Sequence, residues 1–180
     1  MADTRTAEDR IAFLRSLRAV RSFRPDPVPQ EVLDDILEVA RWSGSASNRQ
    51  PWELVVIRDR EILGALASLE GYADHLEGAP LGIVLVMAGE RPTQETYDEG
   101  RLAERIMLAA LAHGVGSTVG WIVGGGRDAA MELLGIPESR TVRTAVSLGY
   151  PAEGASRARR PGQARKPLSE IVHEERYGWL

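Results

Sequence analysis

The sequence of 180 residues contains no cysteine and only three histidines. The first absence excludes disulfide bonds, thiolate metal ligands, iron–sulfur clusters and cysteine nucleophiles. The histidines, at positions 75, 113 and 173, lie too far apart to match a metal-ligand spacing, so we predict no metal site. His113 falls on the apolar stripe of an expected helix, and we therefore expect it to be a buried core residue.

Long apolar runs and a strong net charge are also missing. The longest apolar run, Leu81 to Ala88, is far too short to span a bilayer, and the polar residues 1–5 do not resemble a signal peptide. The net charge of −4 creates no field that would recruit nucleic acid or an anionic membrane. We therefore expect a cytoplasmic protein with no nucleic-acid or membrane partner.

The hydrophobic pattern predicts alternating helices and strands. Expected helices cover about residues 7–17, 30–42, 61–69, 96–113 and 127–134, and expected strands cover about 52–57, 81–87, 117–123 and 141–150. The all-apolar run from Leu81 to Met87 is typical of a central strand that is covered on both faces. We predict one α+β domain over residues 1–180, with a central mixed sheet of about four strands and helices on both sides. Residues from about 152 to 180 would form an extended C-terminal arm.

Two glycine-rich stretches do not fit a nucleotide-binding motif. The run from Gly114 to Gly120 is expected to follow a helix and precede a strand, the reverse of the dinucleotide fingerprint. The run from Gly124 to Gly126 lacks the Gly-Lys-Ser/Thr ending of a phosphate loop, and no Gly-x-Ser-x-Gly elbow occurs. We therefore expect neither a Rossmann site nor a hydrolase nucleophile, and no catalytic side chain is assigned.

Several short motifs occur in an informative order. They are Arg18-Ala19-Val20-Arg21-Ser22-Phe23, Ser45-Ala46-Ser47-Asn48-Arg49-Gln50-Pro51-Trp52, Gly114-Val115-Gly116-Ser117-Thr118 before Trp121-Ile122, Leu134-Gly135-Ile136-Pro137 with Gly149-Tyr150-Pro151, and Arg165-Lys166-Pro167-Leu168. Together they resemble the signatures of the nitroreductase family, and the resemblance covers essentially the whole chain.

This resemblance implies an FMN-dependent oxidoreductase that passes a hydride from NADH or NADPH to an electron-poor acceptor such as a nitroaromatic or a quinone. It also implies a homodimer with FMN at the subunit interface, and a C-terminal extension that packs on the partner. The positions that correspond to cofactor-binding residues are Arg18, Ala19, Arg21, Gly44, Ser45, Ala46, Asn48, Gly116, Ser117 and Arg165.

The chemistry of FMN agrees with these residue types. Its phosphate carries nearly two negative charges and is suited to guanidinium groups, which Arg18, Arg21 and Arg165 would supply. Alternatively, the arginines near residue 18 form a solvated cationic face at a helix C-terminus. The Ser45–Asn48 segment would reach the flavin bound mainly by the other subunit, or else would be a polar helix-to-strand connection.

The chain also departs from the family pattern. Leu17 and Ala19 replace an Arg and a Ser of the opening signature, Gly44 replaces a Pro, and Glu104-Arg105 replaces a Gln-Asn pair. These differences keep three alternatives open: a deazaflavin-dependent relative, a flavin-consuming relative, and a non-enzymatic flavin-binding protein.

Overall fold

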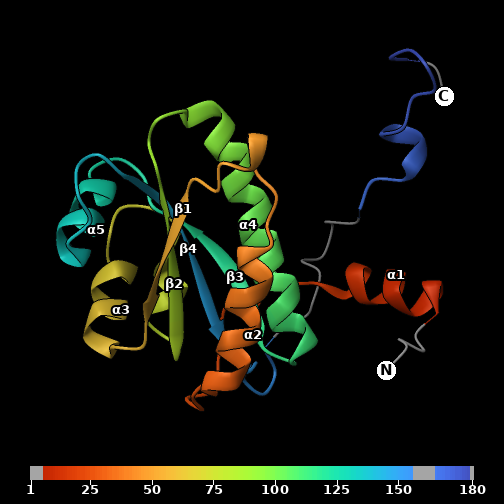
Figure 1. Cartoon of the computed structure of the whole chain (residues 1–180). Coiled ribbons are helices and arrows are strands. Elements are labelled where there is room, and N and C mark those ends of the chain that lie inside the picture. Colours follow the sequence, from red (N-terminus) through yellow and green to blue (C-terminus); the bar gives the residue numbers. More distant parts are fainter. Residues whose placement is uncertain (1–5, 156–164, 179–180) are drawn as a thin grey trace.

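The computed structural model describes residues 6–155 and 165–178 (Figure 1). Its helices are α1 (Ala7–Ser16), α2 (Gln30–Arg41), α3 (Arg60–Ala67), α4 (Pro92–Ala112) and α5 (Gly126–Leu134), with short 3-10 turns η1 (Ala46–Asn48), η2 (Asp74–Leu76) and η3 (Leu168–Glu170). The strands are β1 (Trp52–Ile57), β2 (Leu81–Met87), β3 (Gly116–Trp121) and β4 (Thr141–Gly149).

The four strands form one sheet in the order β1-β2-β4-β3. The α+β architecture and the number of strands confirm the sequence prediction, but the expected mixed sheet is wrong. All three strand pairings are antiparallel. Hydrophobic periodicity reports which face a side chain occupies and carries no information on strand direction, so it could not show that the four described strands pair only in antiparallel fashion.

Helices cover both faces of this sheet (Figure 1). On one face, α2 and α4 pack against the β2 residues Leu81, Ile83 and Leu85. On the other, α3 and α5 pack near Val84 and Val86, which alternate with the first set along the same strand. All of β2 is buried, as the unbroken apolar run predicted.

α4 begins four residues earlier than expected, at Pro92 instead of Thr96. Its first turn is polar and shows no apolar periodicity, although proline suits the first position of a helix. Glu95 in this turn is buried, and its carboxylate accepts hydrogen bonds from the backbone N–H groups of Gly89 and Arg91 at 2.8 and 2.9 Å. The carboxylate thus fixes the β2–α4 connection.

His113 does not belong to the core, which overturns the sequence prediction. It follows the last residue of α4, and its Nε2 lies 3.1 Å from the Asp35 carboxylate across the α2–α4 contact. Among the described residues, His75 is the buried histidine, at 7% exposure, in η2 against β3. Burial lowers the pKa of His75, with Asp74 opposing this shift and Arg21 adding to it. The helical periodicity of α4 predicted the wrong histidine, because His113 follows the last residue of the helix and need not stay on its buried face.

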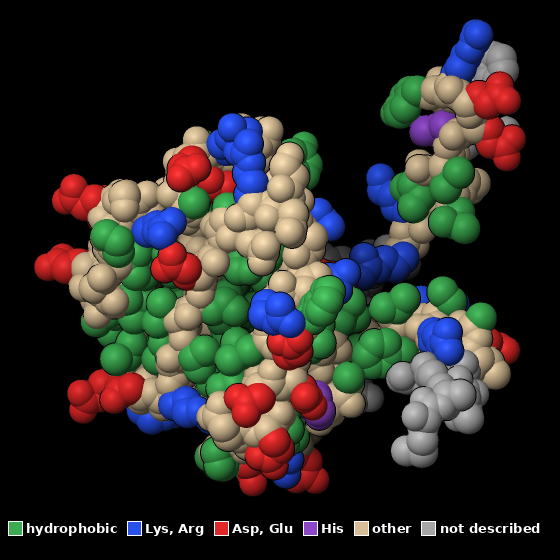
Figure 2. Space-filling view, in the orientation of Figure 1, with side chains coloured by type: hydrophobic (Ala, Val, Ile, Leu, Met, Phe, Trp, Pro, Cys, Tyr) green, Lys and Arg blue, Asp and Glu red, His purple; other side chains and the backbone are tan. Residues whose placement is uncertain are grey.

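The two ends of the described chain project away from this body (Figure 1). α1 has a capping box between Thr6 and Asp9 but buries no residue, and its Ile11 and Leu14 are about half exposed. The C-terminal arm exposes its own apolar residues, namely Leu168, Ile171, Val172 and Tyr177 (Figure 2). Trp179 and Leu180, which we also expected to be apolar contacts of the arm, lie outside the described residues.

No helix in the described ranges is both long enough and apolar enough to cross a membrane. Within the same ranges, no group of three or more His, Asp or Glu side chains could hold a metal ion.

Candidate functional site

A cationic pocket of about 510 Å³ forms where α1, the segment after it and the C-terminal arm meet α4. Three arginines and one glutamate give it its charge, with small and apolar residues around them. Its lining residues are Leu14, Arg15, Leu17, Arg18, Ala19, Glu104, Met107 and Arg165. The structure thus brings together three of the predicted cofactor residues, Arg18, Ala19 and Arg165, in a setting with an excess of positive charge. We call this cavity the arginine pocket.

Arg18 also has a structural role within this pocket. Its Nη1 donates to the carbonyl oxygens of Arg15 and Leu17 at 2.7 and 2.6 Å, at the end of α1. Part of the alternative interpretation, a cation at a helix C-terminus, therefore applies to Arg18. Arg165 has no such bond in the described part of the chain, so its guanidinium is free to meet a ligand.

The backbone after Arg18 joins the arginine pocket to β3. Ala19 and Ser117 form a parallel bridge, and the Val20 N–H donates to the Ser117 carbonyl at 2.9 Å. Gly116 permits this approach, because a Cβ there would lie 2.8 Å from the Val20 Cβ. The Ser117 hydroxyl is buried without a hydrogen-bond partner. Two further predicted positions, Gly116 and Ser117, therefore lie next to the segment that carries Ala19.

Arg21 does not line the arginine pocket, although the sequence grouped it with Arg18 and Arg165. It lies close enough to His75 for its charge to contribute to the lowered pKa of that histidine. The segment from 18 to 23 is extended, so residues three apart project to different sides, whereas the prediction placed both at the end of a helix. The structure thus places Arg21 outside the arginine pocket, and its contact with the cofactor stays a prediction.

The other predicted residues lie in a tight turn between α2 and β1. Ser47, Asn48 and Gln50 have positive φ angles of 53°, 53° and 51°, a conformation that is uncommon for residues other than glycine. The Ser45 hydroxyl stabilises the turn by accepting a hydrogen bond from the Gln50 N–H at 2.8 Å. Strained backbone of this kind is concentrated at functional sites.

α4 anchors this turn from below. The Ala46 N–H donates to the buried Asp98 carboxylate at 3.3 Å, and Arg101 lies 3.7 Å from the same carboxylate. Gly44 lies against the Arg101 guanidinium, which would have to move to make room for a Cβ at this position. Gly44, Ser45, Ala46 and Asn48 are thus held together, as predicted, but not beside the arginine pocket.

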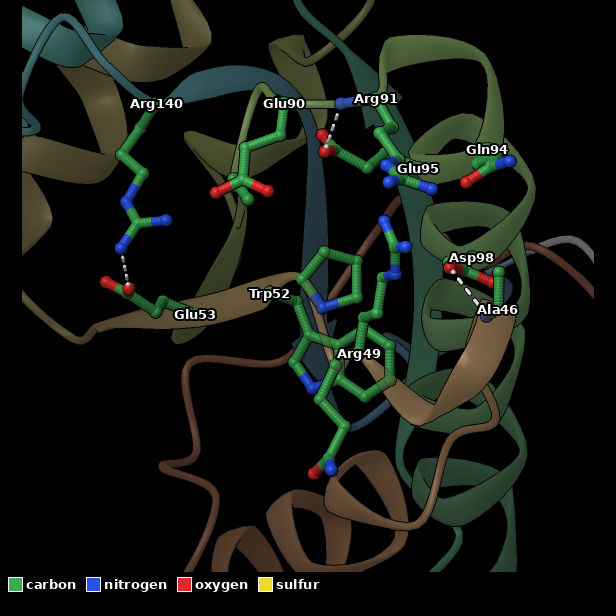
Figure 3. A pocket seen from close by; sticks show the side chains of 13 residues that line it. Ala46, Arg49, Trp52, Glu53, Glu90, Arg91, Gln94, Glu95, Asp98 and Arg140 are labelled. Atoms are coloured by element: carbon green, nitrogen blue, oxygen red, sulfur yellow. Dashed lines mark hydrogen bonds and ion pairs between the residues drawn. The ribbon is translucent and has the colours of Figure 1, made fainter.

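A second cavity, of about 600 Å³, opens between this turn and the start of α4 (Figure 3). The turn, β1, the β2–α4 connection and the first turns of α4 all contribute to its walls. Its lining residues are Ala46, Arg49, Gln50, Pro51, Trp52, Glu53, Ala88, Glu90, Arg91, Gln94, Glu95, Asp98 and Arg140. We call it the turn pocket. The sequence analysis did not anticipate it, because its charged residues come from three stretches far apart in the sequence, within residues 49–53, within residues 90–98 and at Arg140.

A buried ion pair lies beneath α4. Glu99, at 4% side-chain exposure, pairs with Arg143 of β4 across 2.6 Å. Burial raises the pKa of Glu99, while Thr144, Arg143 and Arg127 oppose the shift. The sequence analysis missed this pair, since charged residues on a helix are usually solvated.

The exposed end of β3 carries an apolar surface. Val119 and Trp121 are 41% and 54% exposed and share a face of the strand with Ser117. Tyr72, 73% exposed, lies beside Trp121, to which it is joined by a backbone hydrogen bond of 2.7 Å. β3 therefore runs from the arginine pocket to an exposed pair of aromatic residues.

Within one chain, the predicted cofactor residues other than Arg21 thus form two groups. One group surrounds the arginine pocket, which Glu104 of α4 lines, and the other is anchored on Asp98 of the same helix. Six residues of helix, about 9 Å, separate these two points. The two groups do not share a cavity in this chain.

Comparisons with known proteins place the chain among flavin enzymes. The profile of the nitroreductase family matches residues 14–70. A candidate NADH dehydrogenase/NAD(P)H nitroreductase of Archaeoglobus fulgidus is 34% identical over 155 residues, which cover 81% of this chain and 87% of that protein. An NADH dehydrogenase of Thermus thermophilus is 30% identical, with 86% of this chain and 90% of that protein covered.

Solved structures agree with the sequence matches. An FMN-dependent nitroreductase of Clostridium difficile superposes with a TM-score of 0.82 at 27% identity, covering 93% of this chain and 99% of that one. The NADPH:FMN oxidoreductase of Vibrio harveyi, solved with NAD+, gives a TM-score of 0.79 at 25% identity, covering 94% and 78%. The order of motifs, the fold and these matches lead to one conclusion: the chain belongs to the nitroreductase family.

Proposed function

We propose that this protein is an FMN-dependent oxidoreductase that takes a hydride from NADH or NADPH and passes it to an electron-poor small molecule. The observation that carries the proposal is the arginine pocket, which joins Arg18, Ala19 and Arg165 at the start of β3. Relatives named NADPH-flavin oxidoreductase, from Vibrio harveyi, and FMN reductase [NAD(P)H], from Bacillus subtilis, support the same reaction class.

The residues present fit FMN. Guanidinium groups pair well with a phosphate dianion, and the arginine pocket holds three of them against the single carboxylate of Glu104. Ala19, where the family often has a serine, leaves room in the pocket but supplies no hydroxyl. Ser117, which pairs with Ala19 in the bridge, has a buried hydroxyl with no hydrogen-bond partner among the described residues. This hydroxyl is available to form a hydrogen bond with a polar group of the cofactor.

FMN, when bound, supplies the hydride chemistry itself. The chain would contribute position and electrostatics: Arg18 and Arg165 would hold the phosphate. Val119 and Trp121, exposed farther along β3, would offer an apolar surface to the ring system. We assign none of these residues a proton-transfer step.

The division of the site into two groups supports a shared site in a homodimer. A groove of about 720 Å³ runs along the outer face of α4, between the two groups, and includes Val39, Tyr97, Gly100, Leu108 and Glu104, which also lines the arginine pocket. A second chain seated in this groove would bring its Ser45–Asn48 turn toward the arginine pocket of the first. The C-terminal arm would pack on that partner and cover its exposed apolar residues.

The first test is a reduction assay on the purified protein. We expect FMN to copurify, with a yellow colour that bleaches when NADH or NADPH is added under anaerobic conditions and returns with an electron-poor acceptor such as a quinone. A yellow protein that neither nucleotide bleaches would favour a flavin carrier. A protein with no affinity for FMN would contradict the proposal.

A second prediction concerns assembly. Deleting residues 167–180 should convert a dimer into monomers or aggregates that have lost FMN, because the apolar contacts of the arm would be missing. Light scattering and the flavin absorbance of the same fractions give both readouts. A full-length protein that scatters as a monomer while it holds FMN tightly would rule out the shared site.

A further inference from the structure

Two arginines of the turn pocket have no role in the cofactor site described above. Arg49 lies between Asn48 and Gln50 in the strained turn, and Arg91 precedes α4. Figure 3 shows their guanidinium groups pointing toward one another across the cavity. Neither side chain has a hydrogen-bond or ion-pair partner within the described ranges. The two guanidinium groups repel each other, and an anion bound between them would offset that repulsion.

The carboxylates around the pocket do not satisfy these two arginines. Glu53 is engaged by Arg140 at 2.6 Å, Glu95 by two backbone N–H groups, and Asp98 by Ala46 and Arg101. Glu90 is the remaining acidic residue of the lining, and its carboxylate points to the Arg140 side of the cavity (Figure 3). The space between Arg49 and Arg91 is therefore locally cationic, although the lining as a whole is not.

The rest of the pocket suits a nucleoside. Its volume of about 600 Å³ lies within the range of small-molecule sites. Trp52 and Pro51 provide an apolar wall, and the amide side chains of Gln50 and Gln94 provide donors and acceptors. A phosphate monoester carries nearly two negative charges, which matches two guanidinium groups better than a single carboxylate does.

The turn pocket adjoins the turn that carries the second group of predicted cofactor residues. Its wall includes Ala46, which belongs to the turn that faces a flavin in the proposed function. We propose that the turn pocket binds the adenosine end of NADPH, with Arg49 and Arg91 on its 2′-phosphate, and that the enzyme thereby prefers NADPH over NADH. This proposal rests on the proposed function, since it presupposes a nicotinamide donor at that site.

Binding of two nucleotide fragments tests the proposal without turnover. Adenosine 2′,5′-bisphosphate carries the phosphate that distinguishes NADPH, and adenosine 5′-monophosphate does not. By calorimetry on the FMN-loaded protein, we expect the bisphosphate to bind at least tenfold more tightly. In R49Q/R91Q this preference should disappear, whereas R60Q, a change of the same charge on the α3 side of the sheet, should retain it.

Reduction of the bound flavin separates the possible failures. The proposal predicts that R49Q/R91Q raises the NADPH concentration needed for half-maximal bleaching about tenfold and leaves that for NADH unchanged. An equal loss for both nucleotides would place the arginines on the shared pyrophosphate and overturn the assignment, as would a wild-type protein without fragment preference. If NADH and NADPH both failed to bleach the wild-type flavin, the proposed function would be wrong.

Discussion

R18A/R165A should bind FMN roughly a hundredfold more weakly than the wild-type protein. Each arginine is expected to supply a charge-assisted contact to the phosphate, and such a contact contributes about 1.5–3 kcal/mol. Losing two therefore removes about 3 kcal/mol or more, since 1.4 kcal/mol corresponds to a factor of ten. Fluorescence titration of the apoprotein with FMN measures the change directly.

The single variants separate ligand binding from structure. R165A is the cleaner of the two, because Arg18 also bonds the carbonyls at the end of α1. R10A removes the same charge from α1 without touching the arginine pocket and should leave FMN affinity within about twofold, given the screening of exposed charges. Wild-type affinity in the double variant would remove both residues from the cofactor site.

R143M should destabilise the protein by about 3–5 kcal/mol near neutral pH. Arg143 is the counterion of the buried Glu99, and removing one partner of a buried pair leaves an uncompensated charge. Denaturant unfolding of the wild-type protein and the variant measures the difference in the free energy of unfolding. R143M/E99Q should recover most of the loss, because it removes both charges.

The pH dependence of this loss has a definite sign. Burial already raises the pKa of Glu99, and losing Arg143 raises it further, so the folded variant binds a proton that the unfolded chain releases above about pH 4.3. The deficit of R143M should therefore be small near pH 4 and grow as the pH rises through the raised pKa of Glu99. A deficit that stayed constant over this range would show that lost packing, and not charge, is responsible.

Sequence reasoning was most successful where burial alone determines the pattern. The bounds of β1 and β2 were predicted as the structure has them, since turn-forming residues flank both strands and β2 is apolar throughout. The polar start of α4 was missed, because a buried carboxylate that binds backbone amides leaves no apolar signal. The prediction of strand direction failed for a related reason, because strand direction depends on contacts between residues that are distant in sequence.

The candidate site divides in the same way. Short motifs singled out both groups of candidate cofactor residues, and the structure shows that Arg18, Ala19 and Arg165 line one pocket. Arg21 does not line the arginine pocket, because the helix that would place it beside Arg18 ends before residue 18, and its role at the cofactor stays a prediction. The turn pocket and the Glu99–Arg143 pair lay beyond sequence reasoning, since each joins residues from distant segments.

The left-handed residues of the Ser45–Gln50 turn set a limit for protein engineering. Glycine at position 47 would relieve backbone strain and is a substitution that a search for thermostable variants would favour. The same change would give the turn more conformational freedom and blur the directions in which Asn48 and Arg49 point. A substitution at this turn that raises thermal stability should therefore lower the selectivity for the substrate.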